Sequence, residues 1–410
     1  MNRNSRIFKI FSTLIFLLSG KVYAQQDLNA ITTAVPFLLI APDSRAGGMG
    51  DAGVSSSPDA NSIHWNPSKL AFIDNDMGFS LSYIPWLRQL VPDINISYLS
   101  GYKKIDEGQT IAASLFYSSL GDITFTDAQG MTIGNFRPNE FAFDIAYARK
   151  LSPYFSGGMA ARYIYSNLTM GQQVDGTGTK PGMSVAADIS GYYVNPDIQI
   201  GATPATLTAG INISNIGSKM SYSQTGTRDF IPINLRLGPA LTLRPDEFNS
   251  IAFVLEGMKL LVPTPPIRDP FDNNRVIAGR DPNVGVAAGI FGSFTDAPGE
   301  PVRDEAGNYV FQSDGSVQVE KGSVLKEELR EFNLSIGTEY WYDKQFALRL
   351  GYFHEHATKG NRKYVTFGAG LKYNVFGLDL AYIVPTVQRH PLAQTLRFTL
   401  KMDFAAMKSS

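Results

Sequence analysis

The sequence predicts an all-β fold, a transmembrane outer-membrane β-barrel of about 14 antiparallel strands. Three observations support this prediction. The C-terminal quarter alternates apolar and polar residues, segment after segment, as strands with two different faces do. The chain opens with an export signal. After that signal, no segment reaches the roughly 18 consecutive apolar residues that a membrane helix needs. Barrel strands contain no long run of consecutive apolar residues, because only every second side chain contacts lipid.

Composition narrows the class further. Charged residues make up 18% of the chain, below the roughly 25% that is typical of soluble domains. Aromatic residues reach 12%, and the formal net charge of −1 gives no reason to expect a nucleic-acid partner. The chain has no cysteine, which excludes disulfides, thiol catalysis and a lipid-modified cysteine anchor.

Residues 1–24 have the organisation of a secretory signal peptide. Arg3, Arg6 and Lys9 form a basic start, and residues 11–18 are mostly apolar. Val22-Tyr23-Ala24 supplies small residues at the cleavage positions. We therefore expect the mature chain to begin after Ala24 and to be exported.

The last five predicted strands carry the clearest alternation. In the first of them, the even positions from Phe332 to Tyr342 are apolar or aromatic apart from Thr338, and the odd positions from Glu331 to Glu339 are polar or small. A soluble β-sandwich would alternate in the same way. The barrel is favoured because rings cluster near strand ends, as in an interfacial girdle, and because the polar faces mix glycine, alanine and both charge signs. The rings are Tyr340, Tyr342, Tyr352, Tyr373 and Phe404.

The same test predicts nine earlier strands, near residues 77–84, 92–103, 109–119, 138–149, 154–167, 182–194, 205–214, 231–243 and 249–260. The total is fourteen, an even number, as single-chain bacterial barrels have. Connections after even-numbered strands are mostly short, whereas several after odd-numbered strands are long. Outer-membrane barrels show this pattern, with short turns in the periplasm and long loops outside.

Two regions lie outside the predicted wall of the barrel domain, residues 77–410. The first is residues 25–76, which we expect to fold into the lumen as a plug; the alternative is a periplasmic arm packed under the barrel. The second is an extracellular loop over residues 261–330, and a loop of that length is usually functional or disordered. The expected plug motif comprises Gly47, Gly48, Gly50, Gly53, Trp65, Asn66 and Pro67.

No catalytic or metal site emerges from the sequence. Gly48-x-Gly50-x-x-Gly53 has the letters of a dinucleotide fingerprint but lacks the strand before it and the helix after it. Close packing of the backbone against the wall explains these glycines better. His354 and His356 share one strand face, yet no third metal ligand accompanies them. We therefore predict no cofactor, no metal and no enzyme activity. We also predict inward charges of both signs that pair with one another and with the plug: Asp144, Arg162, Asp188, Arg236, Glu256, Glu331, Glu339, Arg349, Lys372, Asp379 and Arg397.

Several blocks of the chain resemble a known family. Residues 38–53, followed by His64-Trp-Asn-Pro67, look like the plug of the long-chain fatty-acid (FadL-like) transporter superfamily. Within it the chain most resembles the PorV (LptO) family of type IX secretion outer-membrane proteins. One departure is Ser68, where the superfamily usually has alanine. Further supporting blocks are residues 293–299, 337–342, 346–355, 360–363 and 390–392.

The resemblance, and not the composition, implies a function. It implies a non-enzymatic component of the type IX secretion system, in the outer membrane of a Gram-negative, Bacteroidetes-type bacterium. Such a protein receives cargo through the cargo's C-terminal signal domain at a large translocon barrel. It then shuttles the cargo to the sortase attachment complex, for linkage to lipopolysaccharide in the surrounding membrane. The alternative is a FadL-like transporter of fatty acids or other hydrophobic molecules. The sequence does not identify which loop residues contact partner or cargo.

Overall fold

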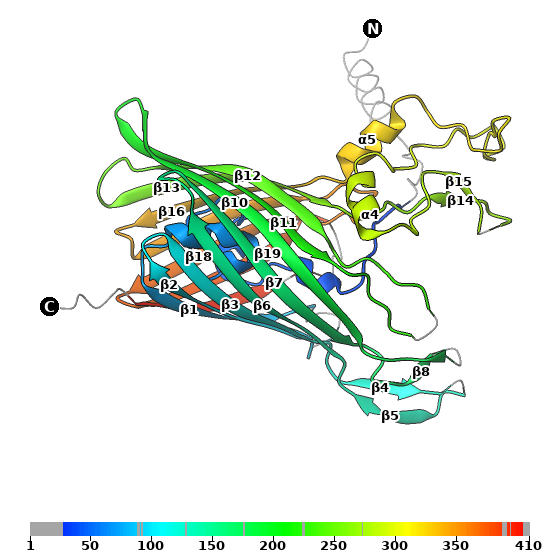
Figure 1. The fold of residues 1–410 in the computed structure, drawn as a ribbon, viewed down its shortest axis with the longest axis horizontal. Coiled ribbons are helices and arrows are strands. Elements are labelled where there is room, and N and C mark those ends of the chain that lie inside the picture. The colour runs from blue at the N-terminus through cyan, green and yellow to red at the C-terminus, as the bar shows by residue number, and fades with distance from the viewer. Residues whose placement is uncertain are drawn as a thin grey trace, which may run out of the picture.

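A closed barrel makes up most of the molecule. The computed structural model describes residues 28–404 apart from 88–90, 92, 128, 175–176, 224–225, 273, 388–391 and 394, so the predicted signal peptide, residues 1–24, lies outside the described residues. Over this range fourteen antiparallel strands pair in chain order, and β1 pairs with β20 to close the wall (Figure 1). The wall strands are β1 (Met77–Pro85), β2 (Asn95–Asp106), β3 (Gln109–Ser119), β6 (Asn139–Lys150), β7 (Phe155–Asn167), β10 (Gly182–Ile200), β11 (Thr203–Gly217), β12 (Asn234–Leu243), β13 (Asn249–Leu260), β16 (Asn333–Tyr342), β17 (Phe346–His354), β18 (Lys363–Tyr373), β19 (Phe376–Pro385) and β20 (Leu396–Phe404).

Alternation places the side chains of each strand on two different surfaces. In β1, Phe79 and Leu81 point outward and are exposed, whereas Ser80 and Ser82, which alternate with them, are buried. Leu81 lies opposite Leu400 of β20, so the outer apolar band continues across the closure. Because a strand repeats every two residues, the same pattern recurs around the wall. The predicted fold class, a transmembrane barrel of fourteen strands, is confirmed.

Some strand boundaries differ from those predicted. β12 begins at Asn234 instead of residue 231, because Pro232 cannot donate to a ladder and Ile231 and Ile233 are buried in the apolar core. β10 extends to Ile200 and β11 from Thr203 to Gly217, with two register shifts between them. Alternation alone does not reveal such extensions, because the polar ends of long strands resemble loops.

The two ends of the barrel differ. At one end, which we call the short-turn end, strands are joined by two to five residues, for example 107–108 and 343–345. The other end, the long-loop end, carries the predicted long connections, including residues 261–332. These hold the small hairpins β4 (Ile123–Thr126)–β5 (Thr132–Phe136), β8 (Gln173–Val174)–β9 (Thr177–Gly178) and β14 (Ile267–Arg268)–β15 (Val276–Ala278), with helices α4 (Val286–Gly292) and α5 (Ser323–Arg330).

Residues 28–76, the N-terminal segment, precede the wall and carry four short helices: η1 (Pro36–Leu39), α2 (Ser44–Gly47), α3 (Ser62–Trp65) and η2 (Pro67–Phe72). Figure 1 shows this blue segment among the strands of the barrel. Among the described residues, no helix has the length and hydrophobicity to cross a membrane.

The interior of the barrel combines an apolar cluster with buried charged residues. Inward side chains of β2, β3 and β7, such as Tyr98, Phe116 and Ile164, form one apolar cluster with Phe37 and Ile63 of the N-terminal segment. Charged residues of both signs point inward from β6, β7, β10, β12, β13 and from β16 to β20. The lumen therefore has the expected mixture of charges, together with an apolar cluster that packs against the N-terminal segment.

Candidate functional site

The N-terminal segment runs through the lumen from one end of the barrel to the other. At the long-loop end, the N–H of Asn29 donates to Thr358 O (2.9 Å). At the short-turn end, the N–H of Asp76 donates to Phe404 O (3.1 Å). Between these points every residue from 41 to 56 is buried. The segment therefore occupies the space in which any ligand passing through the barrel would travel.

The glycines of the expected plug motif lie where the segment touches other groups closely. A Cβ on Gly47 would sit 2.2 Å from Arg397 Nη1, and one on Gly53 would sit 2.3 Å from the Trp65 ring. A Cβ on Gly48 would approach the Gly368 Cα to 3.1 Å. Gly50 has a φ of +71° and would meet the backbone of β17 at 2.7 Å, so it needs glycine for two reasons.

Glycines of the wall face the segment from the other side. A Cβ on Gly351 would lie 2.1 Å from Gly50 N, and one on Gly210 would lie 2.1 Å from Val54 O. Gly158 and Gly337 meet the segment backbone equally closely, at 2.5 Å. Backbone-to-backbone packing of this kind on several strands leaves little room for the segment to slide.

Trp65, Asn66 and Pro67 hold the segment's own fold together. The Trp65 indole Nε1–H donates to Asp43 Oδ2 (2.6 Å), and the ring lies under the Arg236 guanidinium at 4.8 Å. Asn66 donates from Nδ2 to Val54 O (3.0 Å) and to Gly191 O of the wall (3.1 Å). Pro67 begins η2, at the position where a missing N–H costs nothing.

The departure at Ser68 fits this arrangement. Its hydroxyl donates to Asn66 Oδ1 (2.5 Å), and its N–H donates to Ser190 Oγ (3.0 Å). The serine thus adds a hydrogen bond to the same turn.

Charged residues tie the segment to the wall. Arg45 forms two hydrogen bonds with the Glu339 carboxylate (2.9 and 2.7 Å), and Glu339 also accepts from Arg349 (2.7 Å). Arg397 pairs with Asp51 at 2.6 Å. All of these charges are buried, and removing one partner of a buried pair usually costs about 3–5 kcal/mol.

Glu256 adds an anchor of another kind. Its Oε2 accepts hydrogen bonds from the backbone N–H groups of Gly53 and Val54, both at 2.8 Å. Its Oε1 pairs with Arg236 at 2.6 Å. Each of the predicted inward charges forms an ion pair, although Glu331 pairs at the long-loop end and not within the lumen.

Above the segment, buried charges fasten the long loop to the barrel. Lys259 of β13 contacts Glu328 (3.2 Å) and Glu331 (2.5 Å), and Lys359 of the β17–β18 connection contacts Glu327 (2.7 Å) and Glu331 (3.1 Å). We call these five residues the loop clamp. The sequence predicted only Glu331 of the loop clamp, because the members of the clamp come from three separate parts of the chain.

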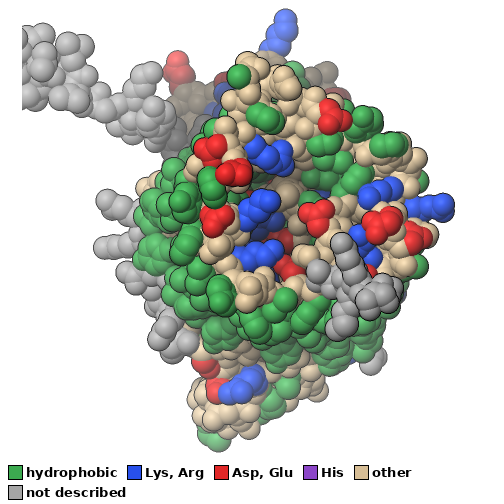
Figure 2. All heavy atoms as spheres, turned by 90° about the vertical axis from the view of Figure 1, so that its left-hand side faces the viewer, with side chains coloured by type: hydrophobic (Ala, Val, Ile, Leu, Met, Phe, Trp, Pro, Cys, Tyr) green, Lys and Arg blue, Asp and Glu red, His purple; other side chains and the backbone are tan. Residues whose placement is uncertain are grey.

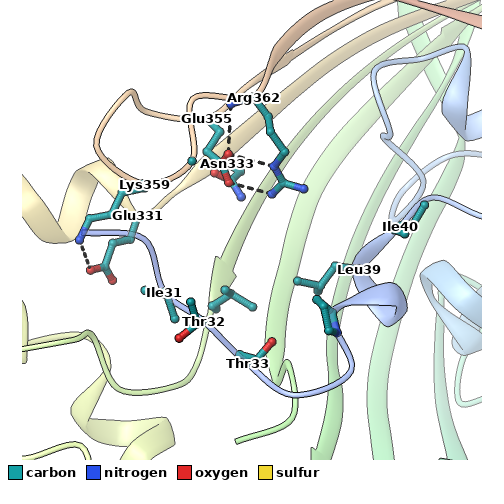
Figure 3. Close-up of a pocket in the computed structure, with 13 residues that line it drawn as sticks. Ile31, Thr32, Thr33, Leu39, Ile40, Glu331, Asn333, Glu355, Lys359 and Arg362 are labelled. Carbon is teal, nitrogen blue, oxygen red and sulfur yellow. Dashed lines mark hydrogen bonds and ion pairs between the residues drawn. The ribbon is translucent and has the colours of Figure 1, made fainter. Parts of the chain in front are cut away.

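The loop clamp borders a cavity of about 330 Å³. Figure 3 shows Lys359 and Glu331 on one side with Ile31 next to them, the Glu355–Arg362 pair beyond, and Leu39 of the N-terminal segment farther across the view. A second cavity, of about 420 Å³, opens at the short-turn end. In Figure 2 that end presents charges of both signs within a ring of hydrophobic side chains.

His354 ends β17, and His356 lies in the connection that follows it. His356 Nδ1 lies 2.9 Å from Thr358 Oγ1, and burial, with smaller contributions from Arg330 and other cations, lowers its pKa. Within the described ranges, no group of three His, Asp or Glu residues is arranged to hold a metal ion. Burial raises the pKa of Asp296, whose Oδ2 accepts from the Thr264 N–H at 3.2 Å.

These features define a class of protein: an outer-membrane β-barrel, apolar outside, whose lumen is occupied by its own N-terminal segment. The family model for the type IX secretion system protein PorV matches residues 23–267, more than half of the chain. The chain therefore belongs to the PorV family and is a type IX secretion component of the Gram-negative outer membrane.

Solved outer-membrane proteins have similar structures at low sequence identity. The Pseudomonas putida toluene transporter TodX is 13% identical, with 92% of this chain and 97% of that chain covered and a TM-score of 0.48. The Ralstonia pickettii toluene transporter TbuX is 11% identical, with 92% and 99% covered and a TM-score of 0.45. A Pseudomonas aeruginosa FadL homologue is 9% identical, with 92% and 100% covered and a TM-score of 0.43. No curated protein sequence matches the chain.

Proposed function

We propose that this protein works without catalysis as a shuttle of the type IX secretion system. In this role it receives cargo through the cargo's C-terminal signal domain at the translocon barrel and passes it to the sortase attachment complex. Membership of the PorV family supports the secretion role. The observation that carries the proposal is the filled lumen: a barrel whose interior is taken up by residues 28–76 is suited to binding partners at its rim.

We infer that the long-loop end faces the cell exterior, because outer-membrane barrels place short turns in the periplasm. We also propose that residues 1–24 are removed as a signal peptide and that the N-terminal segment acts as a plug. The segment then runs from the outside inward, starting at Leu28 beside the long loop. Its glycine contacts and buried ion pairs support a plug that stays in place during function.

The test begins with a strain that lacks the gene. Cargo with the C-terminal signal should accumulate in the periplasm or be released unattached, and the wild-type gene should restore surface display. Normal display in the deletion strain would rule out the shuttle function. The organism is expected to be of the Bacteroidetes type, so a neighbouring gene for a giant barrel would add support.

A loop-shortened variant separates partner contact from folding. Most of residues 303–316 in the long loop are exposed, and the N–H of Val302 donates to Gln318 O (2.8 Å), so a short flexible linker can span the cut. This replacement leaves α4, α5 and the loop clamp in place. We expect a folded barrel with weakened co-purification of translocon or cargo. The matched control replaces the turn of the β4–β5 hairpin, residues 127–131, in the same way.

The alternative function is transport of a fatty acid or another hydrophobic molecule. The cavity beside the loop clamp favours it, because its lining includes Ile31, Leu39, Ile40 and Leu260 together with Arg362. Such a site could hold an acyl chain and its anionic head. One experiment decides between the secretion shuttle and the transporter. The protein is purified from its native membrane, extracted with organic solvent, and the extract is analysed by mass spectrometry. A stoichiometric amphiphile together with an uptake defect in the deletion strain would favour transport.

A further inference from the structure

Helix α5 has its polar and apolar faces arranged the wrong way round for a helix in water. Leu325 and Leu329, one turn apart on the same face, are 67% and 62% exposed. Glu327 and Glu328 are only 7% and 5% exposed. A surface helix normally buries its apolar stripe and exposes its charges. The arrangement of α5 implies that something other than water covers Leu325 and Leu329.

The loop clamp explains why the acidic face is turned inward. Glu328 accepts from Lys259 and from the N–H of Ala297 (2.9 Å), and Glu327 accepts from Lys359 and from the N–H of Gly299 (2.8 Å). Charge-assisted hydrogen bonds of this kind fix the rotation of the helix about its axis. The exposure of the two leucines is therefore enforced by the clamp and is not a chance orientation.

The two leucines form a small apolar surface of their own. Phe294 does not extend it, because its ring lies 5.8 Å from the Lys259 ammonium, on the side of α5 that carries the buried Glu328. We call Leu325 and Leu329 the apolar loop face.

The apolar loop face is continuous with the lipid-facing wall. α5 ends at Arg330, and β16 begins three residues later with Leu334 and Ile336 pointing outward. In Figure 1, α5 follows directly from the long-loop end of β16 and lies at the rim of the barrel. Lys259 lies in the outward register of β13, opposite Leu235, yet it is buried, so the long loop covers the outer face of the wall there.

We propose that the apolar loop face rests in the outer leaflet of the membrane and binds lipid. Its leucines contact acyl chains, and the exposed Lys326, on the helix turn between the leucines, lies at the level of the lipid phosphates. Interfacial helices combine an apolar face with flanking basic residues in this way. The lipid thereby holds the long loop at a defined height, so that the proposed partner surface beyond α5 is presented above the membrane. The proposal rests on the outer-membrane location and on the proposed outward orientation.

Site-directed spin labelling tests this directly, because the native chain has no cysteine. Single variants Leu325→Cys and Leu329→Cys are labelled and reconstituted in vesicles of phosphatidylethanolamine and phosphatidylglycerol. Collisions with oxygen, which concentrates in lipid, are compared with collisions with a water-soluble nickel complex. Leu334→Cys is the lipid control, and Glu305→Cys, on the exposed part of the same loop, is the water control. Heat-modified gel migration confirms that each variant is folded.

We expect the oxygen-to-nickel ratio at positions 325 and 329 to rise toward that of Leu334→Cys. A ratio like that of Glu305→Cys in folded protein would overturn the proposal. Labels shielded from both reagents in native outer membranes, but water-exposed in vesicles, would assign the face to a protein and would overturn it too. The readout does not depend on cargo, so failure of the shuttle function leaves it unaffected.

Discussion

Replacing Gly351 by alanine provides a sharp test of the packing in the lumen. Gly351 lies on the inner face of β17, where an added Cβ would be 2.1 Å from Gly50 N and 2.2 Å from the Met49 carbonyl carbon. Both distances are more than an ångström shorter than an ordinary contact of 3.4 Å. The added Cβ belongs to the wall strand and would meet only backbone atoms of the N-terminal segment at these distances. No side-chain rotation can therefore relieve the clash.

The expected cost follows from this geometry. Overpacking a tight interior costs about 1–3 kcal/mol. Alanine in place of a strand glycine would otherwise gain roughly 0.5–1 kcal/mol through lower chain entropy. Gly257 provides the matched control, since it lies in β13 and its added Cβ would meet nothing closer than 4.0 Å. We expect Gly351→Ala to destabilise the barrel and Gly257→Ala to leave it unchanged or slightly more stable.

Urea unfolding of the protein in lipid vesicles measures both effects as shifts of the midpoint at constant slope. Opposite shifts for the two variants support the packing of the N-terminal segment against β17. Equal midpoints would show that the segment does not contact the wall at Gly351, and the filled lumen would then have to be abandoned.

Three further predictions concern the long-loop end. Lys359→Met removes one ammonium partner from Glu327 and Glu331 and should weaken the loop clamp by about 3–5 kcal/mol. Proteolysis of the long loop should then be faster, while the barrel keeps its heat-modified gel migration. Unchanged proteolysis would contradict the clamp. Because burial raises the pKa of Asp296, the stability that its protonation adds is fully present below the unfolded value of about 3.9 and is lost as pH rises through the higher folded pKa. Protease protection of the loop should therefore decline with rising pH more steeply in wild type than in Asp296→Asn, and identical profiles would exclude this role. An epitope placed between the predicted cleavage site and Leu28 should bind antibody on intact cells, and binding only after the outer membrane is permeabilised would reverse the orientation of the segment.

The positions of the strands could be predicted from the sequence because the alternation that marks a strand involves only neighbouring residues. Side chains alternate every two residues, so Leu334 and Ile336 predict an outward face even when the neighbouring strands are unknown. Connection lengths are equally local, and they predicted which end carries the long loops. The inward position of Arg397 followed from the same alternation.

Partners across the lumen were not readable in this way. Arg397 pairs with Asp51, 346 positions away, and nothing in the sequence near either residue selects the other. Lys259 shows the limit most clearly, since alternation assigns it to the lipid side and the folded loop buries it among Glu328 and Glu331. The start of β12 was misplaced for a related reason, because Ile231 and Ile233 are as apolar as lipid-facing residues but contact the lumen core.

The sequence by itself determined the barrel class, its fourteen strands, the alternation of short and long connections and the resemblance to the PorV family. Tertiary structure decided where the N-terminal segment lies, which charges meet, and how α5 is rotated to expose its leucines. The physical reason is the range of the interactions involved. Strand patterning depends on neighbours two residues apart, whereas the contacts that fill the lumen and fasten the long loop join residues that meet only once the barrel has closed.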